Sequence, residues 1–248
     1  MFFFDPTYLL FMVPAFLLMA VTSWYVNSAY KKWSQVRAQS GLTGAQAAQR
    51  LISSASYATA EGQGLRDVRI LGIGGNLTDH YDPRDKTLKL SPGVANTPSV
   101  AALAIAAHEL GHAMQDSEGY LPLKLRSALV PAVNIGSWLG WLMIMAGIVL
   151  SSFLKVPSIG IQIAWIGVLI FSGGAIFALL TLPVELNASA RAKSLLAESG
   201  IVVGEDEQAG VNNVLNAAAL TYVAGLAAAL LQLLYYVSIV AGLGGRRR

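Results

Sequence analysis

The sequence predicts a mainly α-helical membrane protein with about four transmembrane helices and a small α+β segment between the first two. Three observations lead to this fold class: 54% of the 248 residues are hydrophobic, only 12% are charged, and the mean hydropathy is +0.54. A soluble globular domain carries roughly twice that share of charged residues, about 25%. The composition therefore argues against an ordinary soluble enzyme.

Four long stretches contain no Asp, Glu, Lys or Arg: residues 6–30, 127–154, 156–184 and 208–245. An α-helix needs about 20 mostly apolar residues to cross a bilayer, so each stretch is long enough for one span. We expect these helices at about 8–26, 130–154, 158–182 and 217–240. Buried core helices are the alternative, but a chain of 248 residues has too little polar sequence to bury four of them.

The Lys and Arg residues predict which loops face the cytoplasm, because loops rich in them stay on that side. Residues 31–126 contain 11 of the 17, so we expect this segment in the cytoplasm and the N-terminus outside. Four complete spans leave the basic tail 246–248 outside; either the last segment does not cross completely or the other loops outweigh the tail. The net charge of +3 (17 minus 14) follows from this topology. No basic stripe with interleaved aromatic residues points to nucleic acid.

These features divide the chain into five expected parts. They are an N-terminal span (1–30), a cytoplasmic segment (31–126), a transmembrane hairpin (127–184), a cytoplasmic helix (185–215), and a C-terminal span with a basic tail (216–248).

The cytoplasmic segment has its own predicted elements. Thr43 and Gln46 form a capping-box pattern that predicts a helix to about residue 60. Alternating apolar and polar residues near 68–70 and 88–90 predict two half-exposed strands, with a turn-rich stretch at 74–84 between them. Thr97 and Pro98 fit the N-cap and first position of another helix, which runs to about Asp116.

That last helix contains the motif His108-Glu109-Leu110-Gly111-His112. Two histidines four residues apart lie on one helical face, and their ring nitrogens can bind one Zn²⁺ at about 2.1 Å. Glu109 emerges beside the pair, where its carboxylate can take a proton from a water molecule at the metal and pass it to a leaving amine. Two core histidines are the alternative, but two of only three histidines in the chain fall in this motif.

A catalytic zinc site usually has three protein ligands and one open position, so another side chain must complete it. The candidates are Asp79, His80, Asp82, Asp116 and Glu185. Glu185 is favoured because it is the first charged residue after the third apolar stretch, where an ionisable group is costly unless it has a function. The alternative is an interfacial carboxylate that pairs with Arg191. Asp116, four residues after His112, fits better as outer support for a ligand.

Several short stretches, in a fixed order, carry a resemblance to a known family. They are 3–8 (FFDPTY), 41–44 (GLTG), 77–84 (LTDHYDPR), 90–91 (LS), 107–113 (AHELGHA), 122–126 (PLKLR), 182–188 (LPVELNA) and 215–222 (LNAAALTY). Together they resemble the YugP-like family of bacterial membrane-embedded neutral zinc metallopeptidases, of the HExxH gluzincin type. The resemblance extends to about Leu233. It implies a multi-pass protein of the bacterial inner membrane with a small, cytoplasmic, zincin-like catalytic domain.

The resemblance implies a role for four residues: His108, His112 and Glu185 as zinc ligands and Glu109 as general base. The family is more distantly similar to HtpX-type and CaaX prenyl proteases. HtpX-type relatives carry Glu-x-x-Ala-Asp, whose Asp supports a zinc-binding histidine, whereas this chain has Ser189 in that place. Asn187 or Asp116 is then expected to supply the support.

An amide hydrolase also needs a donor that stabilises the oxyanion formed in the reaction. The sequence offers His80, Tyr81, Arg191 and Tyr222. His80 and Tyr222 rank first: His80 precedes the strand before the catalytic helix, where zincins place a substrate-binding edge strand, and Tyr222 begins the last span on the side of Glu185. A turn hydrogen bond for His80 and an interfacial aromatic anchor for Tyr222 are the alternatives.

These residues favour a membrane-embedded zinc endopeptidase that acts on peptide or membrane-protein substrates at the cytoplasmic face of the bilayer. A catalytically silent zinc-binding scaffold is the alternative, although a purely structural site needs no base such as Glu109. A transporter with a regulatory zinc ion is disfavoured because no span has an ionisable pair at its middle. Small residues in the last two spans, among them Gly173, Gly174 and Gly225, permit close helix contacts within one chain or in a homo-oligomer.

Overall fold

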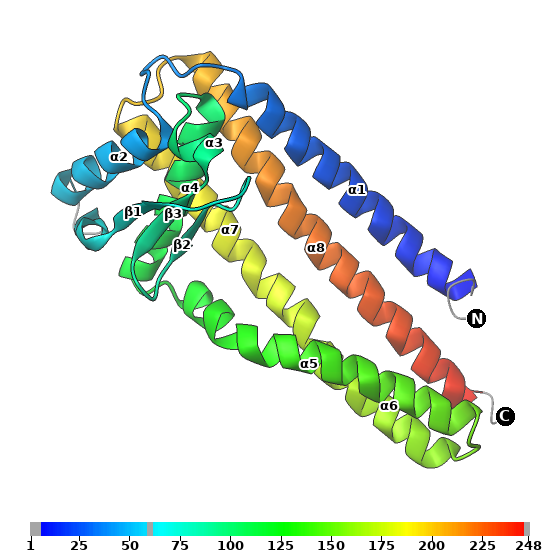
Figure 1. Cartoon of the computed structure of the whole chain (residues 1–248). Helices are drawn as coiled ribbons and strands as arrows, with labels where there is room; N and C mark the ends of the chain where they lie inside the picture. The colour runs from blue at the N-terminus through cyan, green and yellow to red at the C-terminus, as the bar shows by residue number, and fades with distance from the viewer. Residues whose placement is uncertain (1–5, 59–61, 246–248) are drawn as a thin grey trace. The chain divides into compact units, whose positions relative to one another are not determined.

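The computed structural model describes residues 6–58 and 62–245. Three expected features lie partly or wholly outside these residues. They are the end of the helix expected to residue 60, the basic tail 246–248 and the start of the 3–8 stretch. The elements, shown in Figure 1, are α1 (Pro6–Ser34), α2 (Gly44–Ala58), the 3₁₀ helix η2 (Gly62–Asp67), β1 (Arg69–Gly72), β2 (His80–Asp82), β3 (Thr87–Leu90), α3 (Pro92–Ala95), α4 (Val100–Ser117), α5 (Leu121–Ser152), α6 (Pro157–Phe171), α7 (Gly173–Glu198) and α8 (Glu205–Gly245).

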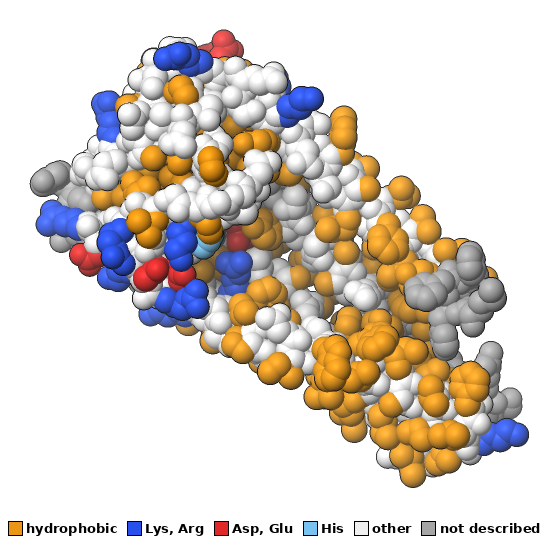
Figure 2. Space-filling model, in the orientation of Figure 1, with side chains coloured by type: hydrophobic (Ala, Val, Ile, Leu, Met, Phe, Trp, Pro, Cys, Tyr) orange, Lys and Arg blue, Asp and Glu red, His pale blue; other side chains and the backbone are white. Residues whose placement is uncertain are grey.

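The described residues form two compact units. The first comprises the chain up to Val21, Leu125–Leu182 and the residues from Tyr222 onward, and the second comprises Thr22–Lys124 and Pro183–Thr221. Figure 2 shows hydrophobic side chains over much of the visible face of the first unit, whereas charged side chains gather over the second. The first unit thus contains most of the apolar stretches of the sequence, whereas His108, Glu109, His112 and Glu185 all lie in the second.

Within residues 6–58 and 62–245, four helical segments are long and apolar enough to cross a membrane, which confirms the predicted number. They are Pro6–Ser34, Leu121–Ser152, Pro157–Glu198 and Glu205–Leu243. Each helix continues beyond the stretch expected to cross the bilayer. Glu185 consequently lies inside α7, and the stretch expected as one helix, 185–215, consists of the end of α7, a turn and the start of α8. The turn contains Gly200 and Gly204 at positive φ, a conformation that glycine adopts at little cost. Gly200 follows the end of α7, where such a conformation commonly ends a helix.

Helices α5 and α6 form a tightly packed hairpin in the first unit. A Cβ atom at Gly140 would lie 2.8 Å from the carbonyl oxygen of Gly167, and one at Gly147 would lie 2.6 Å from the backbone nitrogen of Ala164. Glycine therefore allows the two backbones to touch, which is how apolar helices gain packing energy in lipid. Gly173 and Gly225, two small residues that the sequence suggested for close contacts, have nothing within 4 Å of such a Cβ.

The second unit contains a three-stranded sheet in the order β1-β3-β2. Strands β1 and β3 are parallel and occur where the alternating pattern predicted them. Strand β2 pairs antiparallel with β3, with Tyr81 opposite Leu88. The prediction of a turn-rich stretch at 74–84 was therefore wrong for His80–Asp82, because three residues are too few to show an alternating pattern. Strand β2 forms one edge of the sheet.

The helix starts in this unit show one success and one error. The capping box is confirmed, since the backbone N–H of Thr43 donates to Gln46 Oε1 at 3.0 Å and that of Gln46 donates to Thr43 Oγ1 at 3.3 Å. The N-cap of α4 is Ser99, whose side chain accepts a hydrogen bond from Ala102, and not Thr97. The reason is that the carbonyl of Pro98 accepts a hydrogen bond from the backbone N–H of Ala38. This bond keeps Pro98 in an extended segment before the helix.

Candidate metal centre

Helix α4 carries both motif histidines and forms the centre of its unit, where Leu103 and Leu110 are fully buried. It crosses α7 at a close contact. A Cβ atom at Gly111 would collide with the backbone carbonyl of Ala188, so only glycine allows the two helices to approach this far. This approach brings Glu185, one turn before Ala188 on α7, to the motif histidines.

The side chains of His108, His112 and Glu185 converge, and their donor atoms lie within 4.8 Å of one another. Nε2 of His108 and Nε2 of His112 lie 3.3 and 3.5 Å from the same atom, Glu185 Oε2. Two ligand atoms bound to one tetrahedral zinc ion at about 2.1 Å are about 3.4 Å apart, whereas a charge-assisted hydrogen bond measures about 2.7–2.9 Å. The spacing and the donor set of two imidazoles and one carboxylate therefore fit a zinc ion.

The other ring nitrogen of each histidine has its own partner. Ser189 Oγ lies 3.2 Å from His108 Nδ1, and Gln115 Oε1 lies 3.0 Å from His112 Nδ1. Contacts of this kind orient an imidazole so that its second nitrogen faces a metal. A hydroxyl group thus stands where the HtpX-type pattern has a carboxylate.

The support expected from Asp116 or Asn187 takes a different form. The carboxylate of Asp116 accepts a hydrogen bond from the Tyr81 hydroxyl at 2.9 Å. Asn187 reaches the histidines only through Gln115, whose amide donates to Asn187 Oδ1 at 2.9 Å. Gln115 was missed by the sequence analysis. Its position three residues after His112, on the same helical face, is the signal that could have identified it.

Glu109 is buried beside the histidine pair, with 9% of its surface exposed. Its Oε2 accepts a hydrogen bond of 3.0 Å from the backbone N–H of Tyr81 in β2. Burial raises the pKa of the Glu109 carboxyl above its ordinary value, and this outweighs the opposite influence of His108 and His112. A carboxyl group with a raised pKa is better matched to proton transfer near neutral pH.

Comparison with known proteins decides the family. The model of a family described as putative neutral zinc metallopeptidase matches residues 8–241. The chain is also 40% identical, over 214 residues, to a Bacillus subtilis (strain 168) protein named putative membrane protease YugP; the match covers 86% of this chain and 88% of that protein. The chain belongs to this zinc metallopeptidase family. No solved structure gives a significant match.

The other acidic candidates for the third ligand have partners elsewhere. Asp79 accepts hydrogen bonds from the backbone N–H and the hydroxyl of Ser91, at 2.7 and 2.9 Å. Asp82 accepts hydrogen bonds from Arg84 and Lys89 at 2.9 and 3.0 Å, and these two bonds hold its pKa below the ordinary value. In the part of the chain that the structure describes, only the His108, His112 and Glu185 group has three such donor atoms close together.

The four oxyanion-donor candidates lie in different places. His80 is in β2, and its Nδ1 lies 2.8 Å from the carbonyl oxygen of Thr78, so this nitrogen carries a proton and donates it. The Tyr81 hydroxyl donates to Asp116, and Arg191 forms a two-armed ion pair with Glu118. Tyr222 lies on α8 in the first compact unit, and its role, like that of His80, stays a prediction.

Proposed function

We propose that the chain is a membrane-embedded, zinc-dependent endopeptidase in which His108, His112 and Glu185 hold the metal. One observation carries this proposal: the Nε2 atoms of both histidines face the same oxygen of Glu185 at distances that fit zinc ligands. The family and the membrane protease relative support the reaction class. The buried carboxylate of Glu109 beside this group favours a peptidase over a catalytically silent scaffold, which has no use for a base.

Zinc held at these residues would polarise the scissile carbonyl group and ease the deprotonation of a water molecule. Glu109 is the proposed base that takes this proton and then delivers it to the nitrogen of the leaving amine. Its burial raises its affinity for the proton, and the hydrogen bond from the Tyr81 N–H fixes its orientation. His80 and Tyr222 are the proposed donors to the oxyanion.

We propose that the substrate binds along β2. This strand is at the edge of the sheet, and the backbone N–H of Tyr81 faces Glu109 rather than β3. An extended peptide can add to an exposed sheet edge through main-chain hydrogen bonds, which here would bring the scissile bond to Glu109. The sheet edge thereby supports cleavage within an extended segment.

The proposed substrates are membrane proteins or their cytoplasmic tails. Four helices of membrane-spanning length support a site close to the bilayer. The excess of Lys and Arg in residues 31–126 supports a cytoplasmic position for the segment that carries His108 and His112.

The proposal is tested on the full chain in detergent, with zinc content and cleavage measured for wild type, Glu109→Gln and Glu185→Ala. We expect about one zinc ion per wild-type chain. Glu109→Gln should keep the zinc and lose cleavage by roughly 100-fold or more, because general acid–base catalysis contributes at least that factor. Glu185→Ala should lose the metal. Glu198→Ala, an exposed glutamate on the same helix, is the matched control and should behave as wild type.

Two outcomes would contradict parts of the proposal. Zinc binding by Glu185→Ala at wild-type affinity would show that another residue is the third ligand. Zinc binding by wild type without cleavage of soluble peptides or of membrane proteins in vesicles would favour the scaffold function.

A further inference from the structure

A fully buried glutamine joins the two helices that carry the candidate ligands. Gln115 on α4 has no exposed surface, and its amide makes three hydrogen bonds. Oε1 lies 3.0 Å from His112 Nδ1, while Nε2 donates to the carbonyl oxygen of Val184 at 2.8 Å and to Asn187 Oδ1 at 2.9 Å. Val184 directly precedes Glu185, so this one side chain contacts a histidine and the backbone beside the carboxylate.

These contacts fix the orientation of the amide. A backbone carbonyl only accepts hydrogen bonds, so the group that faces Val184 must be the NH₂ of Gln115. Oε1 then faces His112, and because an amide oxygen only accepts, His112 Nδ1 must carry the proton. In a neutral imidazole this leaves the lone pair on Nε2, which is the nitrogen that faces Glu185.

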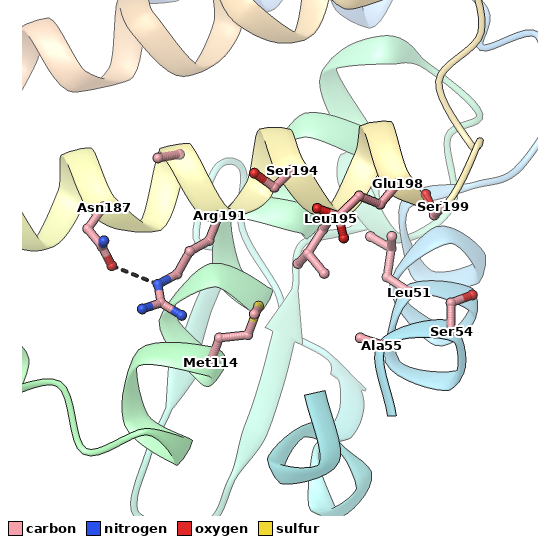
Figure 3. A pocket seen from close by; sticks show the side chains of 11 residues that line it. Leu51, Ser54, Ala55, Met114, Asn187, Arg191, Ser194, Leu195, Glu198 and Ser199 are labelled. Carbon is pink, nitrogen blue, oxygen red and sulfur yellow. Dashed lines mark hydrogen bonds between the residues drawn. The ribbon is translucent and has the colours of Figure 1, made fainter. Parts of the chain in front are cut away.

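The network continues to the wall of a cavity. Asn187 Oδ1 also accepts a hydrogen bond from Arg191 Nε at 2.7 Å, drawn as a dashed line in Figure 3. Arg191 in turn holds Glu118 at the end of α4 through its two terminal nitrogens. Asn187 and Arg191 line a cavity of about 400 Å³ together with Met114. Gln115 is therefore the buried member of a chain of polar contacts that reaches from His112 to this cavity.

We propose that Gln115 is a positioning residue of the metal centre, which holds His112 in the metal-binding tautomer and ties α4 to the turn of α7 that carries Glu185. The inference rests on the proposed function for the identity of the metal. A carboxylate at this position could accept from His112, but it would place an oxygen without hydrogens against Val184 O and Asn187 Oδ1. Only a neutral amide satisfies all three partners, since it offers one acceptor and two donors in one plane.

The principal test compares zinc affinity in the full-length protein, by competition with a chelator, for wild type, Gln115→Met and Gln115→Glu. Methionine matches the shape without the hydrogen bonds and should weaken zinc binding roughly 10- to 100-fold, the usual effect of losing an outer partner of a ligand. Glutamate keeps the acceptor for His112 and loses both donors, so it too should bind zinc more weakly than wild type. Gln49→Met, at an exposed glutamine on α2, is the matched control and should leave the affinity unchanged.

A second measurement does not depend on how the variants fold. Nitrogen-15 NMR of labelled histidine in metal-free wild type, at alkaline pH where imidazole is neutral, should show His112 protonated at Nδ1. Cobalt substitution gives a third readout, because an altered ligand arrangement changes the visible spectrum of the bound ion. Gln115→Met should change that spectrum and Gln49→Met should not.

The outcomes separate the two proposals. Failure of wild type to bind zinc would overturn the proposed function, while the histidine tautomer would still test the Gln115 arrangement. Zinc binding by Gln115→Met with wild-type affinity and spectrum, or an Nε2-protonated His112 in wild type, would overturn the role of Gln115.

Discussion

Two close helix contacts in this chain use glycine for different ends. In the α5–α6 hairpin, Gly140 and Gly147 let apolar helices touch along their backbones, and the gain is packing. In the α4–α7 contact, Gly111 lets the helices approach equally closely, but here the buried side chains near the contact include polar ones, among them Glu185 and Gln115. The α5–α6 contact therefore contributes to stability alone, whereas the α4–α7 contact also sets the distances between the candidate metal-binding atoms of His108, His112 and Glu185.

The largest expected effect comes from breaking the polar contact with Gly111→Ala. The added Cβ would collide with the carbonyl of Ala188, which is backbone and cannot rotate away. Overpacking of this kind typically lowers the free energy of unfolding by about 1–3 kcal/mol. Because Glu185 moves with α7, zinc affinity should fall by more than roughly 100-fold, beyond the loss of one outer contact.

Thermal unfolding and chelator competition measure both effects. Gly72→Ala in β1 is the control, since an added Cβ there meets nothing within 4 Å. Wild-type zinc affinity in Gly111→Ala would show that the α4–α7 distance does not set the ligand geometry.

Breaking the apolar contact should separate stability from metal binding. Gly147→Ala places a Cβ against the backbone of Gly160 and Ala164 and should lower the free energy of unfolding by about 1–3 kcal/mol. Zinc affinity per folded molecule should stay at the wild-type value. Gly225→Ala, in another apolar helix but with open space beside it, should leave zinc affinity unchanged and should not lower the free energy of unfolding. A matching loss of zinc affinity in Gly147→Ala would erase the distinction between the two contacts.

Ser189→Ala sharpens the comparison inside the polar contact. It removes the hydroxyl that lies 3.2 Å from His108 Nδ1 and leaves Gly111 and the helix spacing intact. Zinc affinity should fall by roughly tenfold, the lower end of the range for an outer partner, with little change in the unfolding temperature. Ser53→Ala, at an exposed serine of α2, controls for the loss of a hydroxyl. The prediction fails if both serine variants bind zinc equally well.

The smallest expected effect is that of Tyr81→Phe. The Tyr81 hydroxyl donates to Asp116 at 2.9 Å, while the contact with Glu109 uses the backbone and survives the substitution. Because Tyr81 is only partly buried, water can replace part of this hydrogen bond, and its loss should lower the free energy of unfolding by about 0.5–1.5 kcal/mol. Zinc affinity and the effect of Glu109→Gln should be unchanged, as chelator competition and peptide cleavage can show.

Patterns that extend over many residues of the sequence were sufficient to predict most of the helices. Uncharged stretches longer than a bilayer span identified the four apolar helices, and the capping box located the start of α2. The errors were local. Strand β2 has three residues, fewer than an alternating pattern requires, and the N-cap of α4 moved from Thr97 to Ser99 because a bridge to Arg37 extends the chain before the helix.

The metal ligands of the candidate site were predictable because their residue types and spacing are typical of zinc sites. Two histidines at helical spacing and an isolated glutamate at the end of an apolar stretch pointed to the three residues that the structure brings together. Gln115 was not predicted because glutamine is common on helix surfaces. The burial of its side chain depends on how α4 packs against α7. The expectation for Asp116 failed for a related reason, since Tyr81 from a strand that was not predicted occupies that carboxylate.

The shortness of β2 has a consequence for selectivity. A strand of three residues, His80–Asp82, offers an incoming peptide only a few backbone groups, and the N–H of Tyr81 is already shared with Glu109. For the proposed peptidase, residues on either side of the cleaved bond would then contribute little discrimination. The selectivity of such an enzyme would depend on the position of the substrate next to the bilayer and on its extended conformation more than on its amino-acid sequence.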